Sequence, residues 1–414
     1  MKTLQSFFVL LFAIAHIHST KAQSTLVLTL PDVIRLADSK SLQATLNHHS
    51  FLISEWSYKS YKANYLPSLS LYAAPLSYNN ASNLRYNSNT QTDEYVRTQT
   101  LNSYAYLTAS QNVALTGGTL FAKTSLNRIK NYGANGYDQY SSVPFQIGYS
   151  QQISGYNAMK WERKIAPLKY TIAQKEYLQS EETNHLQSVA YFFDLALAQE
   201  AAATAALNLH NNQQILEIAR KRYELGTLTQ SEVLTFELQY NNARITDQSA
   251  QIDLRQAHEA LLSYLLLPID IQIVLTLPQE LPLSQIDASQ VLGKALENNP
   301  ALLTLDEAIL EASQNVSKTR SQRYIQASVS ASYGLSKNDG TNGQVGELAK
   351  VYQSDFDKYS SFNLGITIPI LDWGQAKGQY QMARSQQQVA ELSAQQARQQ
   401  FEQSVRTFST TFNL

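Results

Sequence analysis

The sequence of 414 residues contains no cysteine. It therefore offers no disulfide framework, no thiolate ligand for a metal ion and no N-terminal cysteine for lipidation. Charged residues make up only 16% of the chain, and the formal net charge is −1. Such a chain lacks the basic footprint with which proteins bind nucleic acid, so nucleic acid is not an expected partner.

Long hydrophobic runs are also missing. The apolar stretch from Phe7 to Ile17 is too short to cross a bilayer as a helix. Lys2 precedes it and the small residue Ala22 follows it, a pattern typical of a secretory signal peptide, here residues 1–22. No later stretch of about 18 apolar residues occurs, so no transmembrane helix is predicted for the exported chain.

Glycine and proline are both absent from Leu168 to Leu225. This stretch predicts a single helix on the order of 85 Å long. An ordinary globular helix has about 11 or 12 residues, so this one is expected to span a distance. Part of this helix has apolar residues at the alternating spacing of three and four that is typical of a coiled-coil seam. They are Leu186, Val189, Phe193 and Ala196.

A second long helix is expected to return along the first. Its apolar positions alternate in spacing between three and four residues, as in a coiled coil. They are Val233, Phe236, Tyr240, Ala243, Asp247, Ala250, Leu254, Ala257, Leu261 and Tyr264, with Asp247 as the one charged position. Between the helices, Gly226 suits a left-handed helix end. Thr229 and Glu232 have the spacing of a capping box for the returning helix.

Strands are expected on both sides of this hairpin. Residues 69–74, 104–115, 119–127 and 145–153 alternate in polarity with the period of a strand, and so do 328–335 and 362–370. Residues 79–100 are rich in Asn, Ser and Thr and are interpreted as a loop. The order helix, strand, loop, strand, long helix occurs twice, which indicates an internal duplication. The expected domains are a first repeat over residues 23–267, a linker over 268–286 and a second repeat over 287–414.

Three short motifs occur in a particular order along the duplicated chain. They are residues 65–71 (YLPSLSL), residues 219–226 with Arg222, Tyr223 and Gly226, and residues 368–374 (IPILDWG). In this order, and with the signal peptide, the chain resembles the TolC-like outer-membrane efflux proteins. The resemblance covers nearly the whole exported chain and implies an α+β membrane protein with long helical coiled-coil hairpins.

The resemblance also implies a function and its partners. Three copies would form a homotrimer, in which each gives strands to one shared β-barrel in the lipid of the outer membrane. The helices would form a tunnel in the periplasm. The trimer would be a passive exit duct of an efflux or type I secretion system, joined to an inner-membrane pump through a periplasmic adaptor (membrane fusion) protein. The expected adaptor-docking tip is Arg222, Tyr223, Leu225, Gly226, Thr227, Leu228 and Thr229.

Several positions leave alternatives open. Asp247 either fixes the register of its helix or lines the tunnel. The alternating residues Tyr104 to Asn127 form an extra hairpin, either in the barrel or in the external part. The second repeat stops inside its outgoing helix, which implies either a truncated chain or a variant with part of the tunnel wall missing.

An enzyme is not expected. His48 and His49 are adjacent rather than four residues apart, so they do not make a helical metal pair. Asp372 is interpreted as a helix cap rather than a catalytic acid. No catalytic, cofactor-binding or metal-binding residues are predicted. The competing hypothesis is a periplasmic coiled-coil structural or adaptor protein without a pore.

Overall fold

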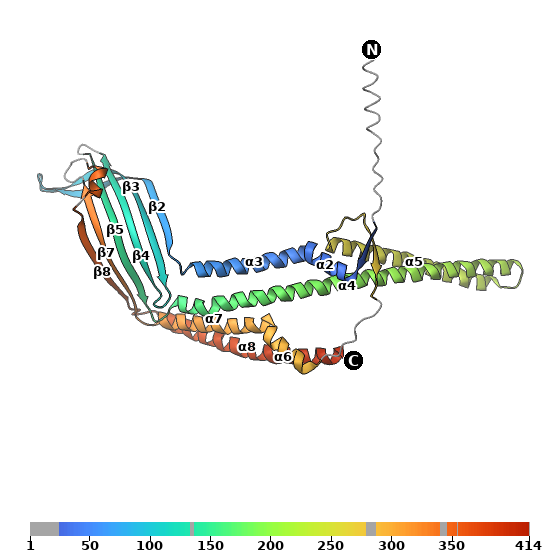
Figure 1. Cartoon of the computed structure of the whole chain (residues 1–414). Coiled ribbons are helices and arrows are strands. Elements are labelled where there is room, and N and C mark those ends of the chain that lie inside the picture. The colour runs from blue at the N-terminus through green and yellow to red at the C-terminus, as the bar shows by residue number, and fades with distance from the viewer. Residues whose placement is uncertain (1–24, 133–135, 279–286, 340–345, 354, 414) are drawn as a thin grey trace, which may run out of the picture. The chain divides into compact units, whose positions relative to one another are not determined.

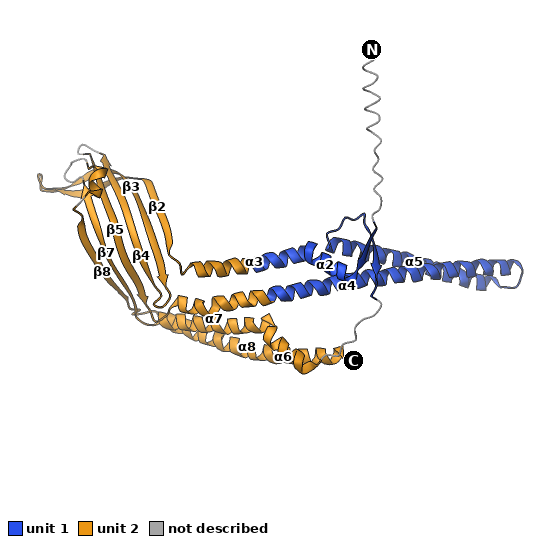
Figure 2. Ribbon diagram, viewed as in Figure 1, with its two compact units in different colours: residues 1–51, 176–284 blue, residues 52–175, 285–414 orange. Residues whose placement is uncertain are grey.

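The computed structural model describes residues 25–132, 136–278, 287–339, 346–353 and 355–413. The signal peptide expected over residues 1–22 lies outside these ranges. Figure 1 labels most of the helices and strands. The chain divides into two compact units, which Figure 2 colours separately. One unit comprises residues 1–51 and 176–284, and the other comprises residues 52–175 and 285–414.

The fold combines long helices with antiparallel strands. Its elements in chain order are β1 (Thr25–Thr29), α2 (Leu30–Lys40), α3 (Leu42–Ala63), β2 (Ser68–Asn87), β3 (Thr92–Val113), β4 (Gly118–Tyr132), β5 (Tyr137–Ile153), α4 (Ala158–Glu224), α5 (Gln230–Tyr264), β6 (Gln272–Thr276), α6 (Ala288–Asn298), α7 (Pro300–Gln322), β7 (Gln326–Asp339), η1 (Leu348–Tyr352), β8 (Asp357–Thr367) and α8 (Gln375–Phe412). The repeated order of elements confirms the internal duplication. A short strand, a short helix and a longer helix precede the sheet strands in each half.

The first unit is built around the parallel pair of β1 and β6. Its buried core consists of Leu28, Val33, Ala37, Phe192, Leu195, Leu261, Leu262, Leu265 and Ile273. These residues come from β1 and β6, from α2, from α4, and from α5 and its C-terminal end. Strand β6 lies within the expected linker, residues 268–286, so part of that linker is ordered structure. Residues 279–286 of it lie outside the described ranges.

The entry to α2 follows from local chemistry. Pro31 stands in the first turn of α2, where a missing N–H costs no helical hydrogen bond. The Thr29 hydroxyl lies 2.6 Å from an Asp32 carboxylate oxygen, and the Thr29 backbone N–H donates to the same oxygen. These bonds satisfy a donor at the helix start.

The second unit contains a six-stranded sheet in the order β2-β3-β4-β5-β7-β8, and every neighbouring pair is antiparallel. Two glycines make room for aromatic rings on it. A Cβ at Gly148 would collide with the Phe121 ring, and one at Gly334 would lie 2.8 Å from the Tyr359 ring. These rings therefore pack directly over backbone, which pins the register of their strands.

The loop expected at residues 79–100 is wrong for most of its length. Strand β2 continues to Asn87 and β3 begins at Thr92, with Tyr78 opposite Leu101 and Asn87 opposite Thr92. Only residues 88–91 turn. A hairpin rich in Asn, Ser and Thr has the same composition as a loop, so composition misled the interpretation. The cross-strand backbone hydrogen bonds decide the outcome.

The extra segment from Tyr104 to Asn127 forms the C-terminal part of β3 and the N-terminal part of β4. Both strands are internal to the sheet, because β3 pairs with β2 and β4 pairs with β5. The hairpin therefore belongs to the six-stranded sheet.

Helices α7 and α8 pack together in the second unit, where Arg398 of α8 forms an ion pair with Asp306 of α7. Helix α4 joins them through Lys169, whose amine lies 2.7 Å from Glu311 and 3.3 Å from Glu307. Asp372 precedes α8, and its carboxylate accepts hydrogen bonds from the backbone N–H groups of Gly374 and Ala376. The interpretation of Asp372 as a helix cap is confirmed.

Candidate functional site

The reversal between α4 and α5 is a closed hydrogen-bonded turn. Gly226 has a φ of +73°, in the left-handed region that glycine enters without a steric penalty. The Thr227 N–H donates to the Arg222 carbonyl at 2.9 Å, and the Gly226 N–H donates to the Tyr223 carbonyl at 2.9 Å. This pair of bonds is a Schellman motif, which satisfies carbonyls that the helix end leaves without partners.

The start of α5 is fixed from the other side. The Glu232 N–H donates to the Thr229 hydroxyl, and the Thr229 N–H donates to the Glu232 carboxylate at 2.8 Å. The expected capping box is therefore present. The backbone and hydroxyl hydrogen bonds from Thr229 hold the pKa of Glu232 below its ordinary value. Both ends of the reversal are thus set by bonds within a few residues.

The structure brings together all seven residues of the expected tip at this reversal. All are exposed except Leu228, which is half-buried. Leu225 is 78% exposed and Tyr223 is 46% exposed. A cross-hairpin ion pair between Arg220 and Glu237, at 3.2 Å, lies just before the turn. The turn is therefore held in place by hydrogen bonds and an ion pair, and it exposes the side chains of Leu225 and Tyr223 to solvent.

The predicted seam of α5 is confirmed. Every one of its ten positions is half-buried or buried, whereas most of the intervening residues are exposed. Asp247 is half-buried in this seam, and its Oδ1 atom is buried without a hydrogen-bond partner among the described residues. A carboxylate oxygen held this way destabilises its site, because burial removes water and no donor replaces it.

The seam predicted for α4 is met only in part. Val189, Phe193 and Ala196 are half-buried, but Leu186 is 71% exposed. The fully buried positions nearby are Asn184, Ser188, Phe192 and Leu195. Beyond Leu195 the buried and half-buried positions of α4 follow the heptad spacing, through Ala202 and Ala205 to Leu216 and Ala219. The prediction followed the apolar residues alone, but the polar residues Asn184 and Ser188 are buried beside Phe192 and Leu195.

Asn184 is a buried polar centre that sequence reasoning missed. Its amide nitrogen donates to Asp38 at 3.2 Å, and its side-chain oxygen accepts from the Tyr264 hydroxyl at 2.6 Å. Ser41 Oγ also approaches that oxygen, at 3.4 Å. The side chain therefore links α4 with α5 and with the α2–α3 junction. In the sequence, the only indication of this centre is an asparagine on the side of α4 that also carries Phe192 and Leu195.

His185 lies beside this centre. Its Nε2 atom is 2.9 Å from an Asp38 carboxylate oxygen, and its Nδ1 atom is 3.4 Å from Glu182. Burial by itself lowers the pKa of His185. The hydrogen bond and charge of Asp38, together with Glu182, outweigh burial and raise the pKa above its ordinary value.

The two faces of the six-stranded sheet differ in chemistry. One face carries apolar side chains that are exposed, including Leu69, Leu71, Leu120, Phe362, Leu364 and Ile366. The opposite face, in the rows of Ser68 and Ser70, includes Ser110, Thr108, Lys123, Gln146, Ser332 and Ser361. An exposed apolar face of this extent needs a covering partner, whereas the polar face suits water.

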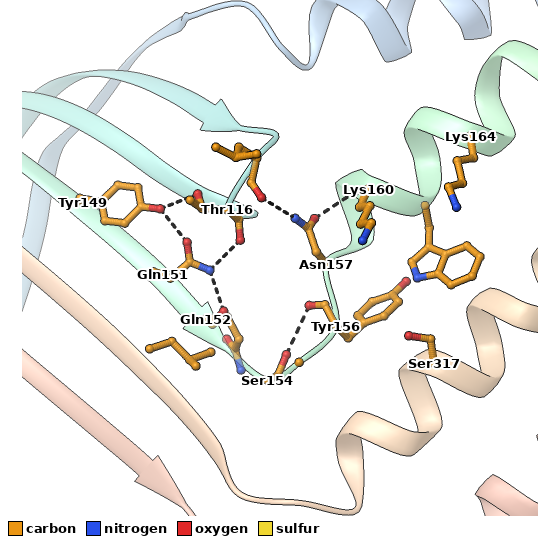
Figure 3. A pocket seen from close by; sticks show the side chains of 14 residues that line it. Thr116, Tyr149, Gln151, Gln152, Ser154, Tyr156, Asn157, Lys160, Lys164 and Ser317 are labelled. Carbon is orange, nitrogen blue, oxygen red and sulfur yellow. Dashed lines mark hydrogen bonds between the residues drawn. The ribbon is translucent and has the colours of Figure 1, made fainter.

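A network of side chains joins the sheet to the start of α4, as Figure 3 shows. The Tyr149 hydroxyl lies 2.6 Å from both the Thr116 hydroxyl and Gln151 Oε1. Asn157 caps the helix by accepting from the Lys160 N–H at 3.1 Å, and its amide donates to the Ala114 carbonyl. A cavity of about 730 Å³ opens beside this junction. The bonds fix the direction in which β5 passes into α4.

Within the described ranges, no cluster of three or more His, Asp or Glu side chains could hold a metal ion. None of the helices described here combines the length and apolar character that a membrane crossing requires.

Comparison with known proteins identifies relatives. Residues 291–414 match the family described as outer membrane efflux protein. The outer membrane efflux protein BepC of Brucella suis biovar 1 (strain 1330) is 25% identical over 221 residues, which is 52% of this chain and 44% of BepC. Over these stretches the chain is similar to outer membrane efflux proteins. Its match to BepC spans less than half of that relative's length.

Solved outer membrane proteins share the fold of this chain. The Campylobacter jejuni CmeC outer membrane channel matches 92% of the chain and 71% of its own, with a TM-score of 0.60 and 13% identity. VceC of Vibrio cholerae matches 89% of the chain and 75% of its own, with a TM-score of 0.58 and 16% identity.

Proposed function

We propose that this protein is the outer-membrane exit duct of a tripartite efflux or type I secretion system. Channels of the family are trimers. Three copies would join their sheets in the outer membrane and their helices in the periplasm. Cargo would pass from an inner-membrane pump through a periplasmic adaptor into the duct and then to the exterior.

The observation that carries this proposal is the pairing of two features in one chain. The sheet exposes an apolar face while its other face is polar, which is the pattern of strands that lie between lipid and water. The same chain carries a long hairpin of helices with a braced, exposed tip. A coiled-coil structural or adaptor protein without a pore would have no use for an exposed apolar sheet face.

The tip is proposed to dock the adaptor through residues 222–229. Leu225 is its most exposed large apolar side chain. We expect Leu225→Asp to abolish cross-linking of the tip to the adaptor, whereas Leu225→Met retains it, because only the aspartate must be desolvated on docking. Equal cross-linking of both variants would remove the tip from the interface.

We propose that Asp247 lines the periplasmic tunnel. The residue is half-buried in the α5 seam, and its Oδ1 atom is buried. The rest of the side chain would face the solvent in the tunnel. A water-soluble carboxyl reagent added to the assembled trimer should reach it.

The proposed function is tested in cells whose own exit duct has been deleted. We expect the expressed protein to fractionate with the outer membrane as a heat-modifiable trimer and to restore export when its adaptor and pump are supplied. A protein recovered free in the periplasm would contradict the proposal and favour the structural alternative.

A further inference from the structure

The six-stranded sheet ends in two open edges. Among the described residues, β2 pairs only with β3, and β8 pairs only with β7. Open edges expose backbone N–H and C=O groups that can pair with another chain. These groups cannot go without hydrogen bonds in the hydrocarbon of a membrane. In the proposed location, each edge therefore requires a partner strand.

Both edges lack the devices that usually protect a sheet edge. No charged residue occurs in β2 before Arg85, and none occurs in β8 from Tyr359 to Thr367. Natural proteins commonly protect exposed edges with charged side chains or proline. Pro75 of β2 lies at the irregularity between Ala74 and Ser77, so the segment from Ser68 to Ala74 keeps its donors. These two segments have the chemistry of strands that are meant to pair.

The direction of the strands fits a second copy of this chain. All five pairings in the sheet are antiparallel, and the number of strands is even. Hence β2 and β8 run in opposite directions. When copies are placed side by side, β8 of one copy meets β2 of the next in antiparallel orientation. The same contact repeats around a ring without a change in direction.

The hairpin of β3 and β4 has the two-faced pattern of the whole sheet. Leu69 of β2 lies opposite Ala109 of β3, which lies opposite Ala122 of β4. The row continues to Ile147 of β5 and Tyr333 of β7. An appendage outside the membrane would have no reason to continue an apolar row. The hairpin therefore has the character of barrel wall.

We propose that three copies pair β8 to β2 in a ring and close one barrel of eighteen strands, six from each copy. The inference rests on the proposed trimeric duct. It adds which edges meet and that the β3–β4 hairpin widens the wall. Barrels of about 16–18 strands enclose an aqueous channel rather than a filled core. The polar rows that include Ser70, Thr108 and Gln146 would line this channel.

Cysteine cross-linking can test the ring directly, because the chain has no cysteine of its own. Ser70→Cys on β2 is combined in turn with Tyr359→Cys, Ser361→Cys or Asn363→Cys on β8. These positions lie on the same face of the sheet, since registered pairs connect Ser70 through Thr108, Lys123, Gln146 and Gly334 to Tyr359. At least one pair should oxidise to a ladder that ends at a covalent trimer.

The matched controls combine Ser70→Cys with Phe362→Cys or Leu364→Cys. These side chains point to the opposite face, so their Cβ atoms cannot reach the distance that a disulfide requires. They should give no ladder. If no same-face pair cross-links in trimers that fractionate with the outer membrane, the edge pairing is wrong while the proposed function stands. If the protein is not in the outer membrane, the proposed function itself fails.

Labelling tests the position of the hairpin. Single cysteines at Thr108 and Ser110 should react with a small membrane-impermeant maleimide several times faster than cysteines at Leu107 and Ala109. The reason is that only the first pair faces water in the proposed barrel. Equal rates at all four positions of β3 would place the hairpin outside the wall and overturn the eighteen-stranded barrel.

Discussion

Gly226 combines a left-handed backbone with open surroundings. Beyond its chain neighbours, a Cβ at this position would meet no heavy atom within 4 Å. Any effect of a larger side chain must therefore come from the backbone conformation rather than from a steric clash. A non-glycine residue in the left-handed region costs roughly 1–2 kcal/mol, and a β-branched side chain is especially unfavourable there.

We expect Gly226→Val to loosen the reversal and to lower both adaptor cross-linking and export. Gly226→Asn is the matched control, because asparagine tolerates the left-handed conformation. Cross-linking efficiency and export should stay near the native level in the asparagine variant. If the two variants behave alike, the geometry of the turn has no part in docking.

His185 makes the first unit sensitive to pH. Its pKa is raised in the folded protein by Asp38 and Glu182 against the opposing effect of burial. The stabilisation is therefore fully present below the ordinary histidine pKa of about 6.5 and is lost as pH rises through the raised value. Because the histidine and Asp38 are both partly exposed, a pair of this kind contributes about 0.2–1 kcal/mol.

The expected result is that His185→Gln lowers the melting temperature at pH 5.5 more than at pH 8. Circular dichroism of the purified protein measures this difference. His49→Gln, at an exposed position of α3, serves as the control and should leave the pH profile unchanged. A His185→Gln variant with a native pH profile would show that the ion pair does not contribute.

At the scale of the element, the α4–α5 hairpin contains a seam with one costly position. Oδ1 of Asp247 is buried with no hydrogen-bond partner in the described part of the chain. A buried polar group without a partner costs about 1–3 kcal/mol. The neighbouring seam positions Ala243, Ala250 and Leu254 are apolar. Selection for stability alone would have placed an apolar residue here.

We predict that Asp247→Leu raises the melting temperature of the full-length protein, because the leucine side chain completes the apolar seam. If Asp247 lines the tunnel, the same change should also lower the export of cationic cargo. Asp247→Asn separates these effects, since it removes the charge but keeps a polar group. A lower melting temperature for the leucine variant would mean that the carboxylate has a partner in the trimer.

At the scale of the whole molecule, the β3–β4 hairpin can be deleted without changing the direction of the remaining strands, because it contributes two strands. Deleting residues 92–132 leaves β2 and β5 antiparallel, so four strands can still form a sheet. Barrel diameter grows roughly linearly with strand number. Three shortened copies would have about two thirds of the circumference, and the cross-section would fall to roughly 0.4 of its original value.

Polyethylene glycol that enters the barrel from outside reduces its single-channel conductance. After the deletion, the largest polymer that still has this effect should be smaller. Deleting residues 83–96 is the matched control. It shortens the part of the β2–β3 hairpin that lies beyond the first β4 contact, at Gln99. The size limit should then stay unchanged. An unaltered limit after removal of the whole hairpin would contradict its place in the wall.

The sequence alone determined the features that depend on neighbours a few residues away. Heptad spacing, the glycine at the reversal and the capping pairs predicted the long hairpin and its tip, because helix formation is decided by local hydrogen bonds. Alternation predicted the central strands and the two faces of the sheet. The duplication and the ordered motifs indicated outer-membrane efflux proteins, the family whose model matches residues 291–414.

The tertiary structure decided the features that depend on distant partners. Residues 79–100 became strands because β2 and β3 satisfy each other's backbone, which a polar composition does not reveal. Asn184 and Ser188 turned inward because other helices supply hydrogen-bond partners or cover them, so the buried stripe of α4 departed from its apolar pattern. The pairing of β1 with β6 joins residues on opposite sides of the long hairpin. Such long-range pairings follow from which chain segments meet in space, and local sequence carries little record of that.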